Sequence, residues 1–311
     1  MPKVANVALF SILIAGFSFA RGQTTHPDAN VSAVAAVSAP AAPADWPQVV
    51  FNVLIDTKKG VMYRIPVSSL EITEDGLPQK IESIAGSGSP VSLCLLIDVS
   101  GSMTSKQSEV RYAAAALVKS LPAGSEVMVS TFAEKSNLVL RFTPAAEVDP
   151  AVFARLQYGH RTALEDALVN TEPYFVRFAS YPRRALVLIT DRGENASKDH
   201  TGDEKHAMEM VGSPFAYVLE IIDPYAPVPE EDLAAMNHFP LGTHFAEMYG
   251  NEKMAVRAAE IAECIDRQYA LSYRSALTAP DKRLHKIEVR LSDPDPRIKI
   301  ESLPGYYIQS H

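Results

Sequence analysis

The sequence predicts an α/β fold: a doubly wound, mainly parallel sheet, inserted in or flanked by a small β-sandwich built from N- and C-terminal strands. In the middle of the chain, continuous apolar runs alternate with amphipathic helical patterns, as expected for strands buried on both faces. Towards both ends, apolar and polar residues alternate with a period of two, which is typical of half-buried strands. Of the 311 residues, 47% are hydrophobic and 21% are charged, which is enough apolar material for a sizeable core.

The beginning of the chain is expected to lie outside this fold. Lys3 precedes a nearly continuous apolar run, and the small residues Ser18 and Ala20 stand where a signal peptidase cuts. We therefore expect residues 1–20 to be a signal peptide, with an uncleaved anchor as the alternative. The protein would then be secreted or periplasmic, with no membrane span after cleavage. Residues 21–46 are rich in Ala and Pro, which predicts a flexible spacer.

The two β-rich segments are expected at residues 47–88 and 268–311. Phe51 begins an alternating pattern in the first segment, and Ile287 begins one in the second. The first segment has about four strand patterns and the second about three. Because three strands alone bury little core, we expect the segments to combine into one sandwich. Two independent β-extensions remain the alternative.

Residues 89–267 carry the α/β pattern. Buried strands are expected at 91–97, 185–189 and 215–222, and further strands at 127–132 and 137–142. Helices are expected at 105–121, from 162 to about 170, and around 203–211, 230–237 and 251–268.

Two carboxylates follow expected strands of this sheet, where α/β sheets usually bind ligands. Asp98 ends the first apolar run and Asp191 follows a later one. In the run from Asp98, Ser100 and Ser102 stand two and four residues further on, and Gly101 permits a tight turn. All of these side chains offer hard oxygen donors, which favour Mg²⁺, Mn²⁺ or Ca²⁺ over zinc.

The Asp-x-Ser-x-Ser run after an apolar strand resembles the metal-ion-dependent adhesion site of von Willebrand factor type A domains. In the same resemblance, Thr162 matches the threonine of the family's second loop, and Asp191 matches its distal aspartate. The resemblance implies a divalent cation, Mg²⁺ or else Mn²⁺ or Ca²⁺, held by five residues: Asp98, Ser100, Ser102, Thr162 and Asp191. It also implies that a protein partner supplies a carboxylate to the remaining coordination position. The implied function is protein binding or adhesion, and not catalysis.

Two further features bear on this resemblance. Arg192 stands beside Asp191 where many relatives place glycine, and His160 and Arg161 crowd the threonine loop. A degenerate site without metal is therefore the alternative. The flanking segments resemble a narrower von Willebrand factor A-related family described from acidobacteria, on motifs at 56–60, 74–76, 79–81, 268–273 and 304–307.

Other function classes fit less well. The net charge of −8, without a basic stripe, argues against nucleic-acid binding. A phosphoryl-accepting aspartate would be expected to have a second carboxylate at Ser100, and no Gly-x-Ser-x-Gly elbow of a serine hydrolase is present. An extracellular or envelope scaffold with a vestigial site remains open, and a metal-dependent hydrolase or phosphatase is a weaker third hypothesis. Cys94 and Cys264 could be buried thiols or form a disulfide.

Overall fold

The computed structural model describes seven stretches of the chain: residues 48–57, 66–191, 193–198, 214–221, 245–247, 251–276 and 283–307. Several expectations lie outside them and stay predictions: the signal peptide, the spacer, Arg192, and the helices around 203–211 and 230–237. Within the described stretches, no helix is long and apolar enough to cross a membrane.

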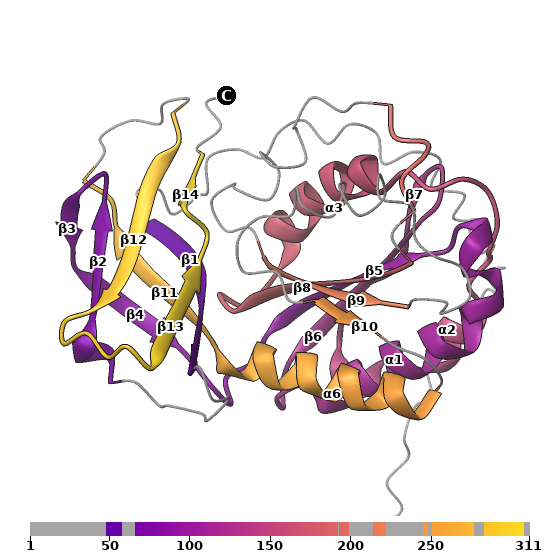
Figure 1. Cartoon of the computed structure of the whole chain (residues 1–311), viewed down its shortest axis with the longest axis horizontal. Helices are drawn as coiled ribbons and strands as arrows, with labels where there is room; N and C mark the ends of the chain where they lie inside the picture. Colours follow the sequence, from indigo (N-terminus) through magenta and orange to yellow (C-terminus); the bar gives the residue numbers. More distant parts are fainter. Residues whose placement is uncertain are drawn as a thin grey trace, which may run out of the picture. The chain divides into compact units, whose positions relative to one another are not determined.

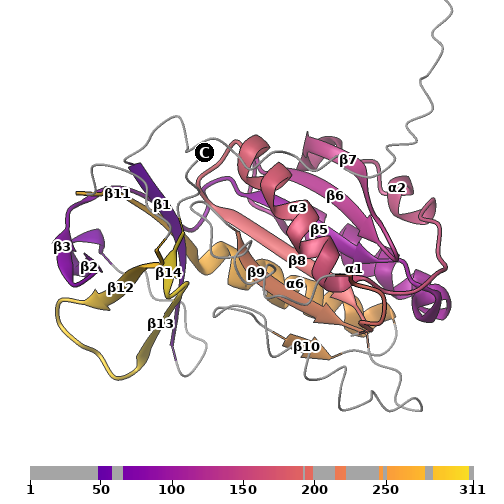
Figure 2. The same cartoon turned by 90° about the horizontal axis from the view of Figure 1, so that it is seen from above.

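A six-stranded sheet forms the centre of the α/β part (Figures 1 and 2). Its order is β10–β9–β8–β5–β6–β7, and every neighbouring pair is parallel except β6 with β7. The strands are β5 (Ser92–Asp98), β6 (Glu126–Phe132), β7 (Ser136–Pro144), β8 (Arg184–Thr190), β9 (Phe215–Glu220) and β10 (Phe245–Glu247). Every residue of β5 is buried, as its continuous apolar run predicts.

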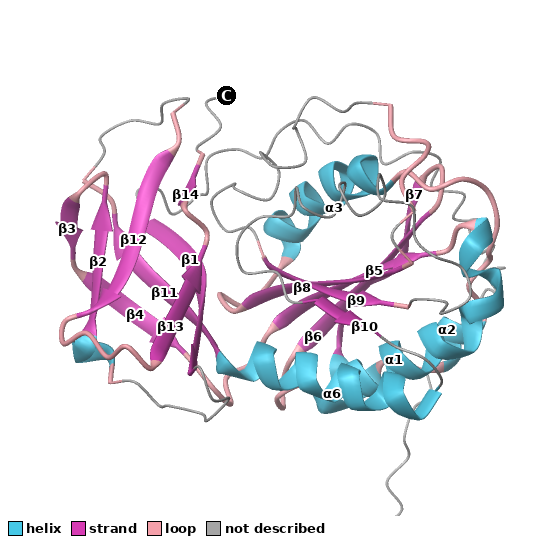
Figure 3. Cartoon of the chain, in the orientation of Figure 1, coloured by secondary structure: helices cyan, strands magenta, loops and turns pink. Residues whose placement is uncertain are grey.

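Helices cover both faces of this sheet, which confirms the doubly wound fold class (Figure 3). The helices are α1 (Gln107–Ser120), α2 (Ala151–Ala154), α3 (Leu164–Phe178) and α6 (Asn251–Arg267), with short 3-10 turns at Val67–Ser69 (η1), Gly101–Lys106 (η2) and Ala145–Glu147 (η3). One core cluster joins the sheet to α1, α2 and α6, and a second joins its other face to α3. Helix α1 buries Val110, Ala113, Ala114 and Leu117, whose spacing of three and four residues places them on one face.

Two four-stranded sheets form the sandwich, and each combines strands from both ends of the chain. One sheet has the order β13–β1–β11–β4 and the other β14–β12–β2–β3. The strands are β1 (Gln48–Thr57), β2 (Leu70–Glu74), β3 (Leu77–Gln79), β4 (Ile81–Ala85), β11 (Gln268–Arg274), β12 (His285–Leu291), β13 (Ile298–Ser302) and β14 (Gly305–Tyr306). Side chains from both sheets share one core cluster, so the expected split sandwich is confirmed.

The structure refines two details of the sequence prediction. In the described part of the chain, four strands, and not three, follow α6. The turn after β2 is a two-residue hairpin in which Asp75 and Gly76 have φ angles of 48° and 81°. This left-handed backbone matches the twist of paired strands and explains the Asp-Gly pair. The expected domain limits stay predictions.

The two cysteines lie in different parts of the core. Cys94 belongs to the cluster beneath α3, whereas Cys264 packs against the cluster on the opposite face of the sheet. Neither cysteine forms a disulfide, because the sheet separates them. The disulfide alternative is therefore wrong for this structure.

Candidate metal centre

The predicted site lies at the switch point of the central sheet, where the order of the strands reverses. Strand β5 lies between β6 and β8, and the chain leaves β5 and β8 at the same edge. Asp98 is the last residue of β5, and Asp191 directly follows β8. Loops that diverge from such a point leave room for a ligand between them.

Asp98 is fully buried, with both carboxylate oxygens hydrogen-bonded. Its Oδ1 accepts the backbone N–H of Ser100 at 2.8 Å, and its Oδ2 accepts the Thr190 hydroxyl at 2.8 Å. Burial raises the pKa of Asp98 to about 6, although the hydrogen bonds from Ser100 and Thr190 oppose the shift. The negative charge of Asp191 adds to the rise. A cation beside these two carboxylates would relieve the cost of their charges.

A chain of hydrogen bonds links the serines of the first loop to the second aspartate. The hydroxyl oxygens of Ser100 and Ser102 lie 3.2 Å apart, and the Ser102 hydroxyl donates to Asp191 Oδ1 at 3.1 Å. Four of the five predicted donors are therefore connected by hydrogen bonds within one small region.

Thr162 joins this region through its own loop. The backbone N–H of Gly101 donates to His160 O at 2.9 Å, which ties the threonine loop to the serine loop. A Cβ added at Gly193 would lie 3.1 Å from Thr162 Oγ1, so the loop after Asp191 passes directly over this hydroxyl. The structure thus connects four of the predicted residues by hydrogen bonds and places Thr162 in a loop that adjoins them. Arg192 is outside the described residues, whereas His160 and Arg161 are exposed.

Lys106 is a member of this site that the sequence analysis missed. Its Nζ lies 2.5 Å from Asp191 Oδ2, and the two side chains are only 15% and 8% exposed. Lys106 also donates to Ser102 O at 3.4 Å. One signal was available: a lysine four residues after Ser102 lies about one helical turn further on, near the same face.

Glu194 and Asn195, in the loop after β8, hold that loop to the threonine loop and to the start of α3. Glu194 Oε2 accepts the N–H groups of Leu164 and Glu165, the first two residues of α3, at 2.7 and 3.1 Å. Asn195 Oδ1 accepts the backbone N–H of Thr162 at 3.0 Å, and the Asn195 N–H donates to Thr162 O at 2.9 Å. Both residues lie in a loop, and no local pattern reveals that they hold the threonine loop.

The donor set fits a hard divalent cation. It consists of two carboxylates and three hydroxyls, with no nitrogen or sulfur. Among the described residues, no group of three or more His, Cys, Asp or Glu side chains is arranged to hold a metal ion. Any cation bound here would therefore depend on the serine and threonine hydroxyls, as the motif requires.

Comparison with known protein families decides what this domain is. Residues 93–194 match the family model of the von Willebrand factor type A domain. The chain contains a von Willebrand factor type A domain. The match begins in β5 and ends at Glu194, so it includes all five predicted metal ligands.

Solved structures with related folds include three bacterial proteins. A von Willebrand factor type A protein from Catenulispora acidiphila is 13% identical, with a TM-score of 0.47, over 84% of this chain and 75% of that one. The D319A mutant of the PilB minor pilin from Streptococcus sanguinis is 11% identical, with a TM-score of 0.47, over 57% and 62%. The pilus adhesin SpaC from Lactobacillus rhamnosus GG is 12% identical, with a TM-score of 0.45, over 82% and 48%.

This chain therefore spans less than two thirds of PilB and about half of SpaC. Likeness at this level carries no information about the ligand of the von Willebrand factor type A domain. No curated protein matches the chain. The narrower resemblance to the acidobacterial family stays a prediction.

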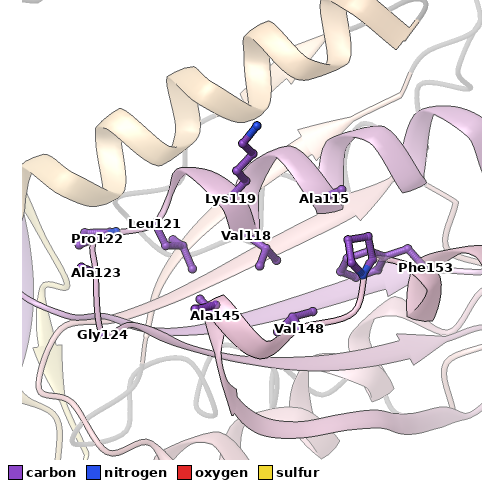
Figure 4. A pocket seen from close by; sticks show the side chains of 12 residues that line it. Ala115, Val118, Lys119, Leu121, Pro122, Ala123, Gly124, Ala145, Val148 and Phe153 are labelled. Atoms are coloured by element: carbon purple, nitrogen blue, oxygen red, sulfur yellow. The ribbon is translucent and has the colours of Figure 1, made fainter.

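A pocket of about 430 Å³ lies beside the last turns of α1, which contribute Ala115, Val118 and Lys119 to its lining (Figure 4). Its walls are almost entirely apolar, and Lys119 is the charged side chain among them. It lies apart from the loops that carry the von Willebrand factor type A motif, since Lys119 is thirteen residues further along the chain than Lys106. At a rise of 1.5 Å per residue, the two lysines are separated by about 20 Å along the axis of the helix.

Proposed function

We propose that this chain is an exported, non-enzymatic binding module that captures a protein ligand through a divalent cation. Asp98, Ser100, Ser102, Thr162 and Asp191 would hold the cation, with Mg²⁺ as the first candidate and Mn²⁺ or Ca²⁺ as the others. The partner would supply an acidic side chain. The observation that carries the proposal is the hydrogen-bonded group of Asp98, Ser100, Ser102 and Asp191 at the switch point of the sheet, with Thr162 in the adjoining loop.

The chemistry of this donor set favours binding over turnover. Three of the five ligands would be neutral hydroxyls, which leave a divalent cation electron-poor and therefore attractive to a carboxylate from outside. Export rests on the signal-like pattern at residues 1–20.

The first test is cation-dependent stability of the full chain. Ligands that bind only the folded state stabilise it by about 2.7 kcal/mol at one hundred times Kd. We expect Mg²⁺ or Mn²⁺ to raise Tm by about 5 °C or more over its value in EDTA, by calorimetry. Asp98→Ala should abolish the rise. Asp149→Ala, which removes a carboxylate that is 69% exposed, should keep it.

A folded wild-type chain whose Tm ignores Mg²⁺, Mn²⁺ and Ca²⁺ would contradict the proposal. That result would favour the second candidate, a scaffold with a vestigial site, which the ion pair between Lys106 and Asp191 supports. Pull-down from extracellular and envelope fractions separates the two further. Capture through the cation is lost in EDTA and in Asp98→Ala, whereas capture by a scaffold survives both.

A further inference from the structure

Lys106 places a fixed positive charge inside the proposed cation site. Its ammonium contacts Asp191 Oδ2, while Asp191 Oδ1 accepts the Ser102 hydroxyl, so both oxygens of this carboxylate already have partners. The lysine is mostly buried, being only 15% exposed. Exposed ion pairs contribute little to the stability of a protein, but this pair is shielded from water and its charges interact more strongly.

The contact comes from the fold, and not from chance proximity on a surface. Lys106 ends the 3-10 turn η2, which begins at Gly101 inside the serine loop. The loop that carries Ser100 and Ser102 therefore also delivers the ammonium to Asp191, the donor from the far side of the site. A cation that binds these donors must share Asp191 with Lys106.

We infer that Lys106 is the residue that sets how tightly this site binds a divalent cation, an inference that rests on the proposed function. Without metal, Lys106 neutralises one of the two carboxylates, Asp98 and Asp191, and so stabilises the folded chain. With metal, the ammonium lies near the cation and repels it. The lysine thus weakens metal binding and leaves an occupied site with excess positive charge, which suits an acidic ligand.

Two opposite effects of removing this charge distinguish the inference from a merely structural role. Lys106→Met should lower the Tm of the metal-free chain, because Asp98 and Asp191 then repel each other without a counter-ion. The same variant should bind Mg²⁺ at least fivefold more tightly in isothermal titration. A purely structural lysine would give a less stable chain that binds metal more weakly.

Two matched variants control for charge and for position. Lys119→Met makes the same change at an exposed residue in the last turn of α1 and should leave Kd for Mg²⁺ within twofold of wild type. Lys106→Arg keeps the positive charge and should not tighten binding. Should Lys106→Met fail to fold, Lys106→Gln removes the charge with a polar side chain and carries the same expectation.

The outcomes separate this inference from the proposed function. Wild type that binds Mg²⁺ or Mn²⁺, with no tighter binding by Lys106→Met or Lys106→Gln, overturns the role of Lys106 alone. Binding by the variants but not by wild type supports it, because the lysine then excludes the ion. Absence of binding in wild type and in both variants overturns the proposed function and this inference together.

Discussion

Asp98 carries its carboxylate where water does not reach, at the end of the central strand. Burial raises its pKa to about 6 from an ordinary value of 3.8. The folded chain therefore holds a proton at Asp98 more tightly than the unfolded chain does. In the absence of metal, this group lowers the free energy of unfolding as the pH rises from about 4 to about 6. Above that range the free energy of unfolding stays lowered by the full amount.

Asp98→Asn should consequently stabilise the metal-free chain at neutral pH. The amide is nearly the same shape as the protonated carboxyl and avoids the buried charge. One pKa unit corresponds to about 1.36 kcal/mol, so the gain could reach about 3 kcal/mol at pH 7.5. Thermal unfolding in EDTA between pH 4 and pH 8 measures it.

The gain should shrink as the pH falls through 6 and disappear near pH 4, where wild type is itself protonated. Asp149→Asn, at an exposed carboxylate, should show no such pH dependence. If Asp98→Asn is less stable than wild type throughout this range, the charge of Asp98 does not oppose folding. If Asp98→Asn is more stable than wild type but its Tm no longer rises with Mg²⁺, Asp98 serves metal binding at the expense of stability.

The residues of the site differ in how far the sequence predicts them. Asp98, Ser100 and Ser102 are close in sequence, so their spacing alone places them in one turn. Lys106 and Asp191 are 85 residues apart, and their contact depends on how β5 and β8 pair. A partner chosen by tertiary structure leaves no local pattern.

At the scale of elements, the site is formed by the serine loop, the threonine loop and the loop after β8. The carboxylate of Glu194 connects the last two through hydrogen bonds. Glu194 accepts N–H groups at the start of α3 and also those of Ala196 and Ser197 in its own loop. Burial alone would raise the pKa of Glu194. The hydrogen bonds from Ser197, Glu165 and Ala196 outweigh burial and lower it below its ordinary value. The carboxylate also meets the positive end of the helix dipole.

Glu194→Gln should therefore loosen the joined loops. The amide NH₂ cannot accept the N–H groups that one carboxylate oxygen holds, which leaves donors unsatisfied at about 1–3 kcal/mol. We expect a lower Tm in EDTA and a severalfold weaker Kd for Mg²⁺, since Thr162 is held through the same loop. Glu288→Gln, an equal change at an exposed residue of β12, should alter neither. Equal Tm values for the two variants would contradict this role.

Most elements follow from sequence patterns, and the exceptions have a physical cause. The apolar run of β5 is a local signal, and the strand predicted from it is confirmed. The Asp-Gly pair after β2 is also a local signal, and it forms a tight turn. The polar cluster inside the sandwich is not local. There Glu74 is buried and accepts hydroxyls from Tyr273, Ser275 and Tyr306, some 200 residues away.

At the scale of the molecule, one buried side chain holds the chain where it enters and leaves the α/β part. Arg183 is fully buried and donates to Ser89 O, just before β5. It also donates to the carbonyls of Ile265 and Asp266 at the end of α6, and to that of Gln268 at the start of β11. The guanidinium thus satisfies carbonyls that the end of a helix leaves without donors.

Arg183→Met should be among the most damaging single changes in the described chain. Four carbonyl oxygens would lose a charged donor, at a cost of about 3 kcal/mol or more in the free energy of unfolding. Urea denaturation followed by circular dichroism measures the loss. The control is Arg290→Met, which removes an arginine that is 68% exposed and paired with Glu71, and should cost at most about 1 kcal/mol.

The shape of the transition tests the same point independently. Wild type should unfold the sandwich and the α/β part together. Arg183 donates hydrogen bonds at both places where the chain passes from one part to the other, just before β5 and between α6 and β11. In Arg183→Met the transition should broaden or divide into two, since the strands that begin at Gln268 would be held less firmly to α6. A single, equally steep transition at an unchanged urea midpoint would contradict this role, and the two parts would then have to be joined by their apolar contacts, such as that of Leu54 with the α/β core.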